Sequence, residues 1–204
     1  ILLLIQIGGM GVVTVAVALN QIAGRKIGLS SRFFLQESMG APQLGGIVRM
    51  LRFILRTMLA MEGIGACLFA IRFIPDYGLL RGTWYSIFHA ISAFCNAGFD
   101  ILSFIPGNSS LSAFNGDPLV TLTISTLIII GSTGFVVFQD IYRKKISTRL
   151  HQQHVEKLSF HAQVCLRASL TLLVFGTVML FILEYNNTYR DLNFFEKLNA
   201  AFFQ

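Results

Sequence analysis

The chain has 204 residues, of which 54% are hydrophobic and 13% are charged, and its mean hydropathy is +0.66. Soluble domains carry about 25% charged residues, so this composition excludes an ordinary water-solvated globular fold. A net charge of +6 would favour a nucleic-acid partner in a soluble chain. No interleaving of aromatic and basic residues accompanies the charge here, so we expect no nucleic-acid partner.

Four apolar segments have the composition of membrane helices. The clearest is Leu119–Phe138, which contains no charged residue and matches a hydrocarbon core of ~30 Å at ~1.5 Å per residue. The other three are Ile1–Leu19, Thr57–Phe73 and Ala168–Leu183. Trp84–Phe94 is mostly apolar but too short to cross a bilayer, which is typical of a re-entrant or interfacial segment.

Basic residues are concentrated in two of the segments between these predicted helices. Asn20–Arg56 holds six of them and Gln139–Gln163 holds five, which together are 11 of the 16 in the chain. The positive-inside rule makes both segments cytoplasmic and the more acidic stretch Arg72–Pro118 external. Neither end resembles a natural terminus, so we expect a fragment of a multi-pass protein of the plasma membrane.

The most informative motif is Phe88–Asp100, with the sequence FHAISAFCNAGFD. Here an apolar half-helix is followed at membrane depth by Asn96–Phe99, and non-helical backbone there is tolerated only when it is buried in protein or lines a water-filled cavity. Carbonyl groups at the C-terminus of such a half-helix favour a cation. Gly98 would let the next residues turn their carbonyls toward the ion, with Asp100 at the external mouth. A tight turn between an interfacial helix and a loop is the alternative.

This motif resembles the second pore loop of the Trk/Ktr/HKT superfamily of potassium transporters. Gln6–Gly11 is similar to the second helix of that family's first repeat, and Phe195–Gln204 to the start of its third pore helix. The resemblance implies an all-α membrane protein, a pore-forming subunit of helix–pore-loop–helix repeats with a re-entrant half-helix and an extended filter segment. It implies that the ion-binding filter residues are Cys95, Asn96, Ala97, Gly98 and Phe99.

The resemblance also divides the chain into five parts. Residues 1–19 form the second helix of a first repeat, 20–56 a basic cytoplasmic loop and the start of a helix, 57–138 a complete repeat, 139–167 a second basic cytoplasmic loop, and 168–204 the first helix and pore-helix start of the next repeat. In this division the chain carries one whole filter segment.

The function that we expect is transport of a monovalent cation, above all potassium, through a filter of backbone carbonyls, with no enzymatic chemistry, no covalent cofactor and no metal beyond the transported ion. The resemblance further implies a homodimer in the lipid bilayer and a cytosolic nucleotide-binding regulatory subunit that docks on the basic loops. Three alternatives stay open: sodium or sodium–potassium transport in the same fold, a non-conducting membrane scaffold, and an intramembrane enzyme using His89, Asp100 or Ser132. We expect His89 to serve packing or hydrogen bonding.

Glu62 is a charged residue inside a predicted span. A charge at the centre of a bilayer is disfavoured by about 2.5–3.5 kcal/mol on insertion scales, which makes it a candidate for function. We expect a buried structural pair with Arg52, Arg56 or a cation of a cytoplasmic loop. A place on the ion pathway is the alternative.

Glycines gather at two places in the predicted spans. Gly131 and Gly134 flank a serine and a threonine in Leu119–Phe138, and we expect them to allow packing or a kink, with direct gating as the alternative. The three glycines of Gln6–Gly11 are expected to permit close contact between helices, with a flexible pore helix as the alternative.

Overall fold

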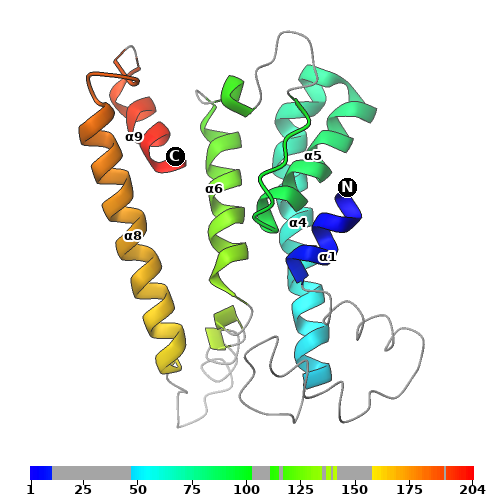
Figure 1. Ribbon diagram of the computed structural model, residues 1–204. Helices are drawn as coiled ribbons and strands as arrows, with labels where there is room; N and C mark the ends of the chain where they lie inside the picture. Colours follow the sequence, from blue (N-terminus) through cyan, green and yellow to red (C-terminus); the bar gives the residue numbers. More distant parts are fainter. Residues whose placement is uncertain are drawn as a thin grey trace, which may run out of the picture.

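The computed structural model describes residues 1–10, 47–102, 111–114, 117–134, 137–138, 140–141, 158–190 and 192–204. The regular elements in these ranges are all helical, as expected: α1 (Leu2–Met10), α4 (Ile47–Tyr77), α5 (Leu79–Phe94), the 3₁₀ helix η2 (Leu111–Phe114), α6 (Pro118–Thr133), α8 (Phe160–Glu184) and α9 (Phe194–Phe203). Figure 1 shows α4, α6 and α8 side by side, with the short helices α5 and α9 at the upper end of the view.

Helix α4 is longer than the predicted span Thr57–Phe73 and begins inside residues 20–56, the segment expected to hold a basic cytoplasmic loop and the start of a helix. Arg52 and Arg56 are four residues apart in this helix, which places them along one side of it. Hydropathy marks only where an apolar stretch begins. It therefore did not detect residues 47–56, the charged first part of the same helix. The rest of the basic segment, residues 20–46, and residues 142–157 of the second one lie outside the described residues.

Helix α6 is shorter than the predicted span Leu119–Phe138. It ends at Thr133, and Gly134 follows with a φ of 85°, in the left-handed region that glycine favours. The hydroxyls of Ser132 and Thr133 both donate to the carbonyl of Ile129, at 3.0 and 2.6 Å. Hydropathy gave one unbroken span because the apolar residues continue past the glycine, whereas the backbone leaves the helix there. Packing or a kink was expected of Gly131 and Gly134, and α6 ends between them; the kink stays a prediction.

Helix α8 begins eight residues before the predicted start at Ala168. Its N-cap is Ser159, whose hydroxyl accepts a hydrogen bond from the amide of Ala162 at 3.2 Å, in the manner that stabilises a first helical turn. Arg167, expected in a cytoplasmic loop, therefore lies within the helix. The earlier start was missed because His161, Gln163 and Arg167 interrupt the apolar residues in the first turns.

The hydrophobic core lies between α4, α5 and α6, with η2 against it. Phe73 of α4 is its centre: the ring stacks on Phe69 at 5.6 Å, meets Phe114 at 5.4 Å and lies edge-on to His89 at 5.7 Å between ring centroids. Phe94, the last residue of α5, is also buried in this cluster. The end of α5 is therefore fixed by side-chain packing from α4 and α6.

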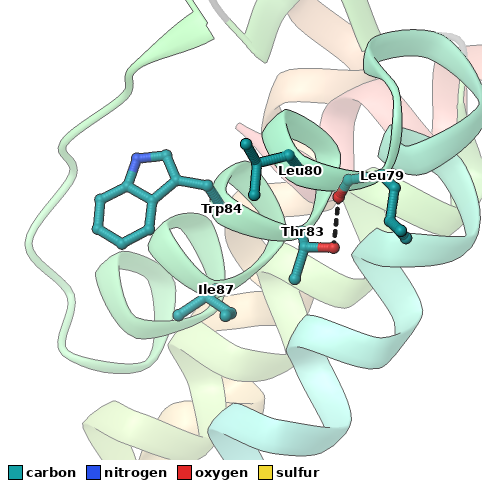
Figure 2. A pocket seen from close by; sticks show the side chains of 5 residues that line it. All are labelled: Leu79, Leu80, Thr83, Trp84 and Ile87. Carbon is teal, nitrogen blue, oxygen red and sulfur yellow. Dashed lines mark hydrogen bonds between the residues drawn. The ribbon is translucent and has the colours of Figure 1, made fainter.

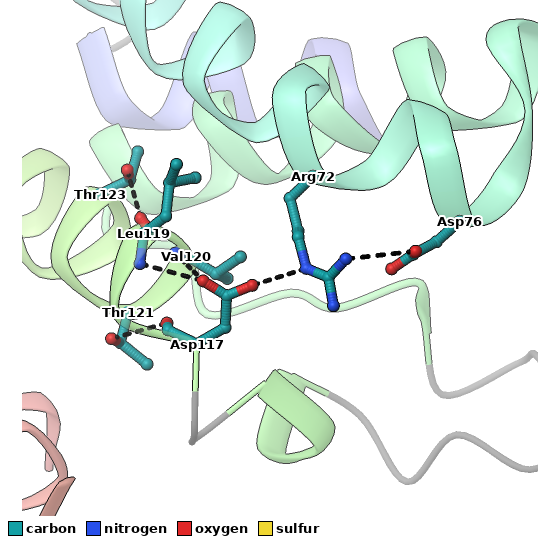
Figure 3. Close-up of polar contacts among 7 residues, drawn as sticks. All are labelled: Arg72, Asp76, Asp117, Leu119, Val120, Thr121 and Thr123. Atoms are coloured by element: carbon teal, nitrogen blue, oxygen red, sulfur yellow. Dashed lines mark hydrogen bonds and ion pairs between the residues drawn. The ribbon is translucent and has the colours of Figure 1, made fainter.

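One polar contact joins α4 to the start of α6. Asp117 caps α6 by accepting the amide of Leu119 at 3.0 Å, and its other oxygen accepts from Arg72 Nε at 2.6 Å. Arg72 also contacts Asp76 at 3.3 Å, so its guanidinium lies between the two carboxylates (Figure 3). The contact fixes where α6 begins relative to α4.

Two of the described helices are long and apolar enough to cross a membrane, Arg52–Tyr77 and Phe160–Glu184. Pro118–Thr133 is apolar but shorter, and α1 is described only as far as Met10. The sequence predicted four crossings, so the described residues support two of them by length. None of the apolar window of α8 is buried inside the structure, which is typical of a helix facing lipid or further helices.

Candidate functional site

Helix α5 ends at Phe94 in a defined cap. The amide of Ala97 donates to the carbonyl of Ser92 at 2.9 Å, and that of Asn96 to Ala93 at 3.1 Å, which is the Schellman pattern with Asn96 in the left-handed position at φ 53°. Asparagine is one of the few residues other than glycine that visits this region routinely. The expected half-helix followed by non-helical backbone at Asn96–Phe99 is thus confirmed.

The cap leaves a run of free carbonyl oxygens behind the helix. The carbonyls of residues 91–93 all accept hydrogen bonds in this cap, because the amide of Cys95 also donates to the carbonyl of Ile91, at 2.9 Å. Within the described part of the chain, the carbonyls of residues 95–98 accept no hydrogen bond. Gly98 has a φ of 69°, and a Cβ there would meet no atom within 4 Å. A side chain at Gly98 would therefore be opposed by backbone strain and not by lack of space.

Side chains on α5 hold the far end of this segment. Ser92 Oγ donates to the carbonyl of Phe99 at 2.8 Å and accepts from the Phe99 amide at 3.0 Å. One residue further on, His89 Nε2 lies 3.0 Å from Asp100 Oδ1, while His89 Nδ1 lies 2.8 Å from the carbonyl of Tyr85. The expectation that His89 serves packing and hydrogen bonding is confirmed.

The carboxylate of Asp100 is engaged on both oxygens. Oδ1 accepts from the amide of Leu102 at 2.8 Å as well as facing His89, and Oδ2 accepts from the amide of Leu111 at 3.1 Å. Its side chain is 16% exposed. The sequence predicted a charge at the mouth of a pore. The structure shows a carboxylate that organises the loop, and its place at a mouth stays a prediction.

Two glycines let neighbouring helices approach the end of α5. A Cβ at Gly9 of α1 would lie 2.7 Å from Cys95 Cβ, and a Cβ at Gly131 of α6 would overlap the carbonyl oxygen of Phe94. The expected packing role of these glycines is therefore seen at both positions, whereas Gly8 has no atom within 4 Å of its Cβ position. Gly11 lies outside the described residues. Gating by Gly131 or Gly134 stays a prediction.

Glu62 of α4 is buried and, among the described residues, pairs with an amide and not with a cation. Gln6 Nε2 of α1 donates to both carboxylate oxygens, at 2.9 and 3.1 Å. Neither Arg52 nor Arg56 forms an ion pair with Glu62 in the described residues. Six residues along a helix turn a side chain by about 240° and move it about 9 Å, so Arg56 points elsewhere. Gln6, which sequence reasoning did not connect to Glu62, supplies the pairing that was expected of an arginine.

The opposite side of α5 is apolar and open. Leu79, Leu80, Thr83, Trp84 and Ile87 line a shallow depression there, formed by one face of the half-helix (Figure 2). Leu80 is 87% and Trp84 51% exposed. The half-helix thus has a polar, buried side against the Asn96–Asp100 segment and an apolar side that is open in the described chain.

A second half-helix repeats the arrangement. Helix α9 follows α8 as α5 follows α4, and its N-cap is Asn193, whose amide donates to Glu196 at 2.9 Å. Lys197 is buried: its Nζ donates to the Tyr185 carbonyl at 3.0 Å and lies 4.0 Å from the Tyr185 ring centroid. Asn199 bonds Thr121 of α6 at 2.8 Å. These contacts were not predicted, because nothing in local sequence pairs residues so far apart.

Residues 2–199 match the protein family described as cation transport protein, TrkH. The chain is 38% identical over 203 residues to Ktr system potassium uptake protein B of Bacillus subtilis, covering 98% of this chain and 43% of that protein. It is 35% identical over 204 residues to potassium/sodium uptake protein NtpJ of Enterococcus hirae, covering 100% of this chain and 42% of that protein. Family and relatives are transporters, which removes the alternative of an intramembrane enzyme. The chain, a membrane protein spanning less than half the length of these relatives, belongs to the TrkH cation transport family.

Proposed function

We propose that Cys95–Phe99 is one of several filter segments around a pore that conducts potassium. The observation that carries the proposal is the run of free carbonyls at residues 95–98, placed directly behind the C-terminus of α5 and shaped by the positive φ of Gly98. Carbonyl oxygens in such a run replace the hydration shell of a monovalent cation, and no covalent chemistry is needed. The negative end of the α5 dipole adds to the attraction.

The roles of the whole protein are inferred from the family. The division at residues 19, 56, 138 and 167 assigns one complete repeat to this chain, so further filter segments come from repeats outside it. Homodimerisation, location in the plasma membrane and a cytosolic nucleotide-binding regulatory subunit belong to the same proposal. The basic segments, cytoplasmic by the positive-inside rule, are the docking faces for that subunit.

Sodium is the second candidate ion, because one relative is named a potassium/sodium uptake protein. A filter of flexible carbonyls distinguishes the two ions by geometry and field strength, so the same fold serves either. The rubidium-to-sodium uptake ratio of the unmodified protein decides between them, with rubidium standing in for potassium.

The test of the filter is Gly98→Ser in the full-length protein, expressed in a host that lacks potassium uptake. At a φ of 69° the new Cβ disfavours the native backbone by about 1–2 kcal/mol, so the carbonyl positions shift and the rubidium-to-sodium ratio falls. Gly63→Ser is the matched control, since Gly63 is an exposed residue of α4 whose Cβ position is also open. An unchanged ratio at normal membrane expression would remove Gly98 from the filter.

A further inference from the structure

We propose that Ser92, His89 and Asp100 form a polar clamp that sets the geometry of the filter segment and so determines which cation it selects. The clamp is defined as the hydrogen bonds of Ser92 to Phe99 and of His89 to Asp100. The proposal rests on the function proposed for Cys95–Phe99. It assigns positioning roles to three side chains that do not themselves face the ion.

The segment is fixed at both ends by the same helix. At its beginning, the Schellman cap ties the amides of residues 95–97 to the last turn of α5. At its end, Ser92 bonds both the amide and the carbonyl of Phe99. The loop from residue 92 to residue 99 is thereby closed on the half-helix by one hydroxyl. The free carbonyls of residues 95–98 lie between these two fixed points, so a change at Ser92 is transmitted to them.

His89 supplies the second point of attachment. It is 2% exposed, and the edge-on ring of Phe73 holds it in place. Its Nδ1 lies 2.8 Å from the Tyr85 carbonyl and its Nε2 lies 3.0 Å from Asp100 Oδ1. The ring therefore bridges the backbone of α5 and the residue that follows the filter segment.

Asp100 is chemically specified by its neighbours. Among the described residues, its two oxygens face His89 Nε2, the amide of Leu102 and the amide of Leu111. An asparagine side chain has the same shape but one oxygen, so after Asp100→Asn either orientation of the amide would set its NH₂ group against a backbone N–H. A buried donor left without an acceptor is unfavourable, and the backbone has to move to relieve it. The carboxylate thus connects the residue after the filter segment to His89 on α5 and to the backbone at Leu111.

Half-helix α5 provides a matched control. Ser86 is a buried serine on the same helix, and its hydroxyl donates only to the Gly82 carbonyl within that helix, at 2.7 Å. Ser86→Ala and Ser92→Ala remove the same atom from similar surroundings. Only Ser92 contacts the filter segment. A comparison of the two variants therefore distinguishes an effect on the position of the filter from the general effect of losing a buried hydroxyl.

The experiment measures rubidium and sodium uptake of the full-length protein and of Ser92→Ala, Asp100→Asn and Ser86→Ala, normalised to membrane expression. We expect Ser92→Ala and Asp100→Asn to lower the rubidium-to-sodium ratio at least about threefold, the scale set by one ordinary hydrogen bond. Ser86→Ala should leave the ratio unchanged. His89→Gln, which retains a donor toward Asp100, should lower it less than His89→Ala.

The outcomes separate this proposal from the one on which it rests. Full-length protein that takes up no rubidium or sodium contradicts the transport function itself. Selective uptake by the unmodified protein, with a ratio unchanged in Ser92→Ala at normal expression, overturns the clamp and leaves the transport function intact. If Asp100→Asn fails to reach the membrane, Ser92→Ala decides alone, because it removes a single oxygen. Equal effects of Ser86→Ala and Ser92→Ala also overturn the clamp.

Discussion

Gly131 of α6 lies so close to Phe94 of α5 that a Cβ would overlap the Phe94 carbonyl oxygen, and the side-chain amide nitrogen of Asn96 lies 3.4 Å from the same position. A helix that is not part of the pore loop therefore touches the residue where the half-helix ends. This contact couples the position of α6 to the start of the proposed filter, and a glycine is required for it.

Gly131→Ala should destabilise the full-length protein by about 1–3 kcal/mol, the range for inserting a methyl group into a packed site. The partner is backbone, which cannot rotate away as a side chain would. Gly63→Ala is the control, because its Cβ position on α4 is open and alanine is the better helix former. Thermal unfolding in detergent measures both. Equal melting temperatures for the two variants would contradict the close contact.

Asp117 combines two roles that substitutions can separate. Asp117→Asn keeps an N-cap for α6 but loses the ion pair with Arg72, whose side chain is 46% exposed. We expect a loss of about 0.2–1 kcal/mol, typical of an exposed pair and reduced further by salt. Asp117→Ala also removes the cap, which should add about 1 kcal/mol. The free energy of unfolding is measured at low and high salt.

Asp76→Asn is the control for this prediction. Asp76 contacts the same arginine but caps no helix of the described chain, so its loss should resemble that of Asp117→Asn. A cost for Asp117→Asn as large as that of Asp117→Ala would show that charge, and not the cap, determines the stability at this helix start.

Gln6 and Glu62 should be energetically coupled although they are 56 residues apart. In a double-mutant cycle with Gln6→Ala and Glu62→Ala, we expect a coupling of about 0.5–3 kcal/mol, because each single change leaves the other polar group buried without its partner. Glu62→Gln should be milder than Glu62→Ala, since its amide oxygen still accepts from Gln6. Additive losses would mean that the two residues act independently.

The half-helix shows how far local sequence reasoning reaches. Its sub-spanning length and the residues Asn96 and Gly98 predicted where regular structure stops, and the structure ends α5 at Phe94 with both residues at positive φ. Local backbone preferences act over a few residues, so they can be read from a short motif. The start of α5 was placed five residues late, at Trp84 instead of Leu79, because hydropathy does not mark a helix start.

The sequence predicted which stretch of backbone forms the candidate site. It did not predict which side chains hold that backbone in place. Ser92 received no role from the sequence, and His89 was expected to form hydrogen bonds without a named partner. A serine and a histidine three residues apart on a half-helix are consistent with many packing arrangements. Which of them meets Phe99 or Asp100 depends on how the chain folds back after Gly98, and that path has no local signature.

The sequence by itself determined the class of protein, the apolar segments and the place where the half-helix gives way to turn, since transfer of apolar residues from water and backbone preferences are properties of short stretches. Only the tertiary structure decided the partners: Gln6 for Glu62, Asp117 for Arg72, and the Phe94 carbonyl for Gly131. These pairs are far apart in the chain, and their contacts arise from how helices pack. Many distant residues could satisfy the same buried group, so the choice among them belongs to the fold.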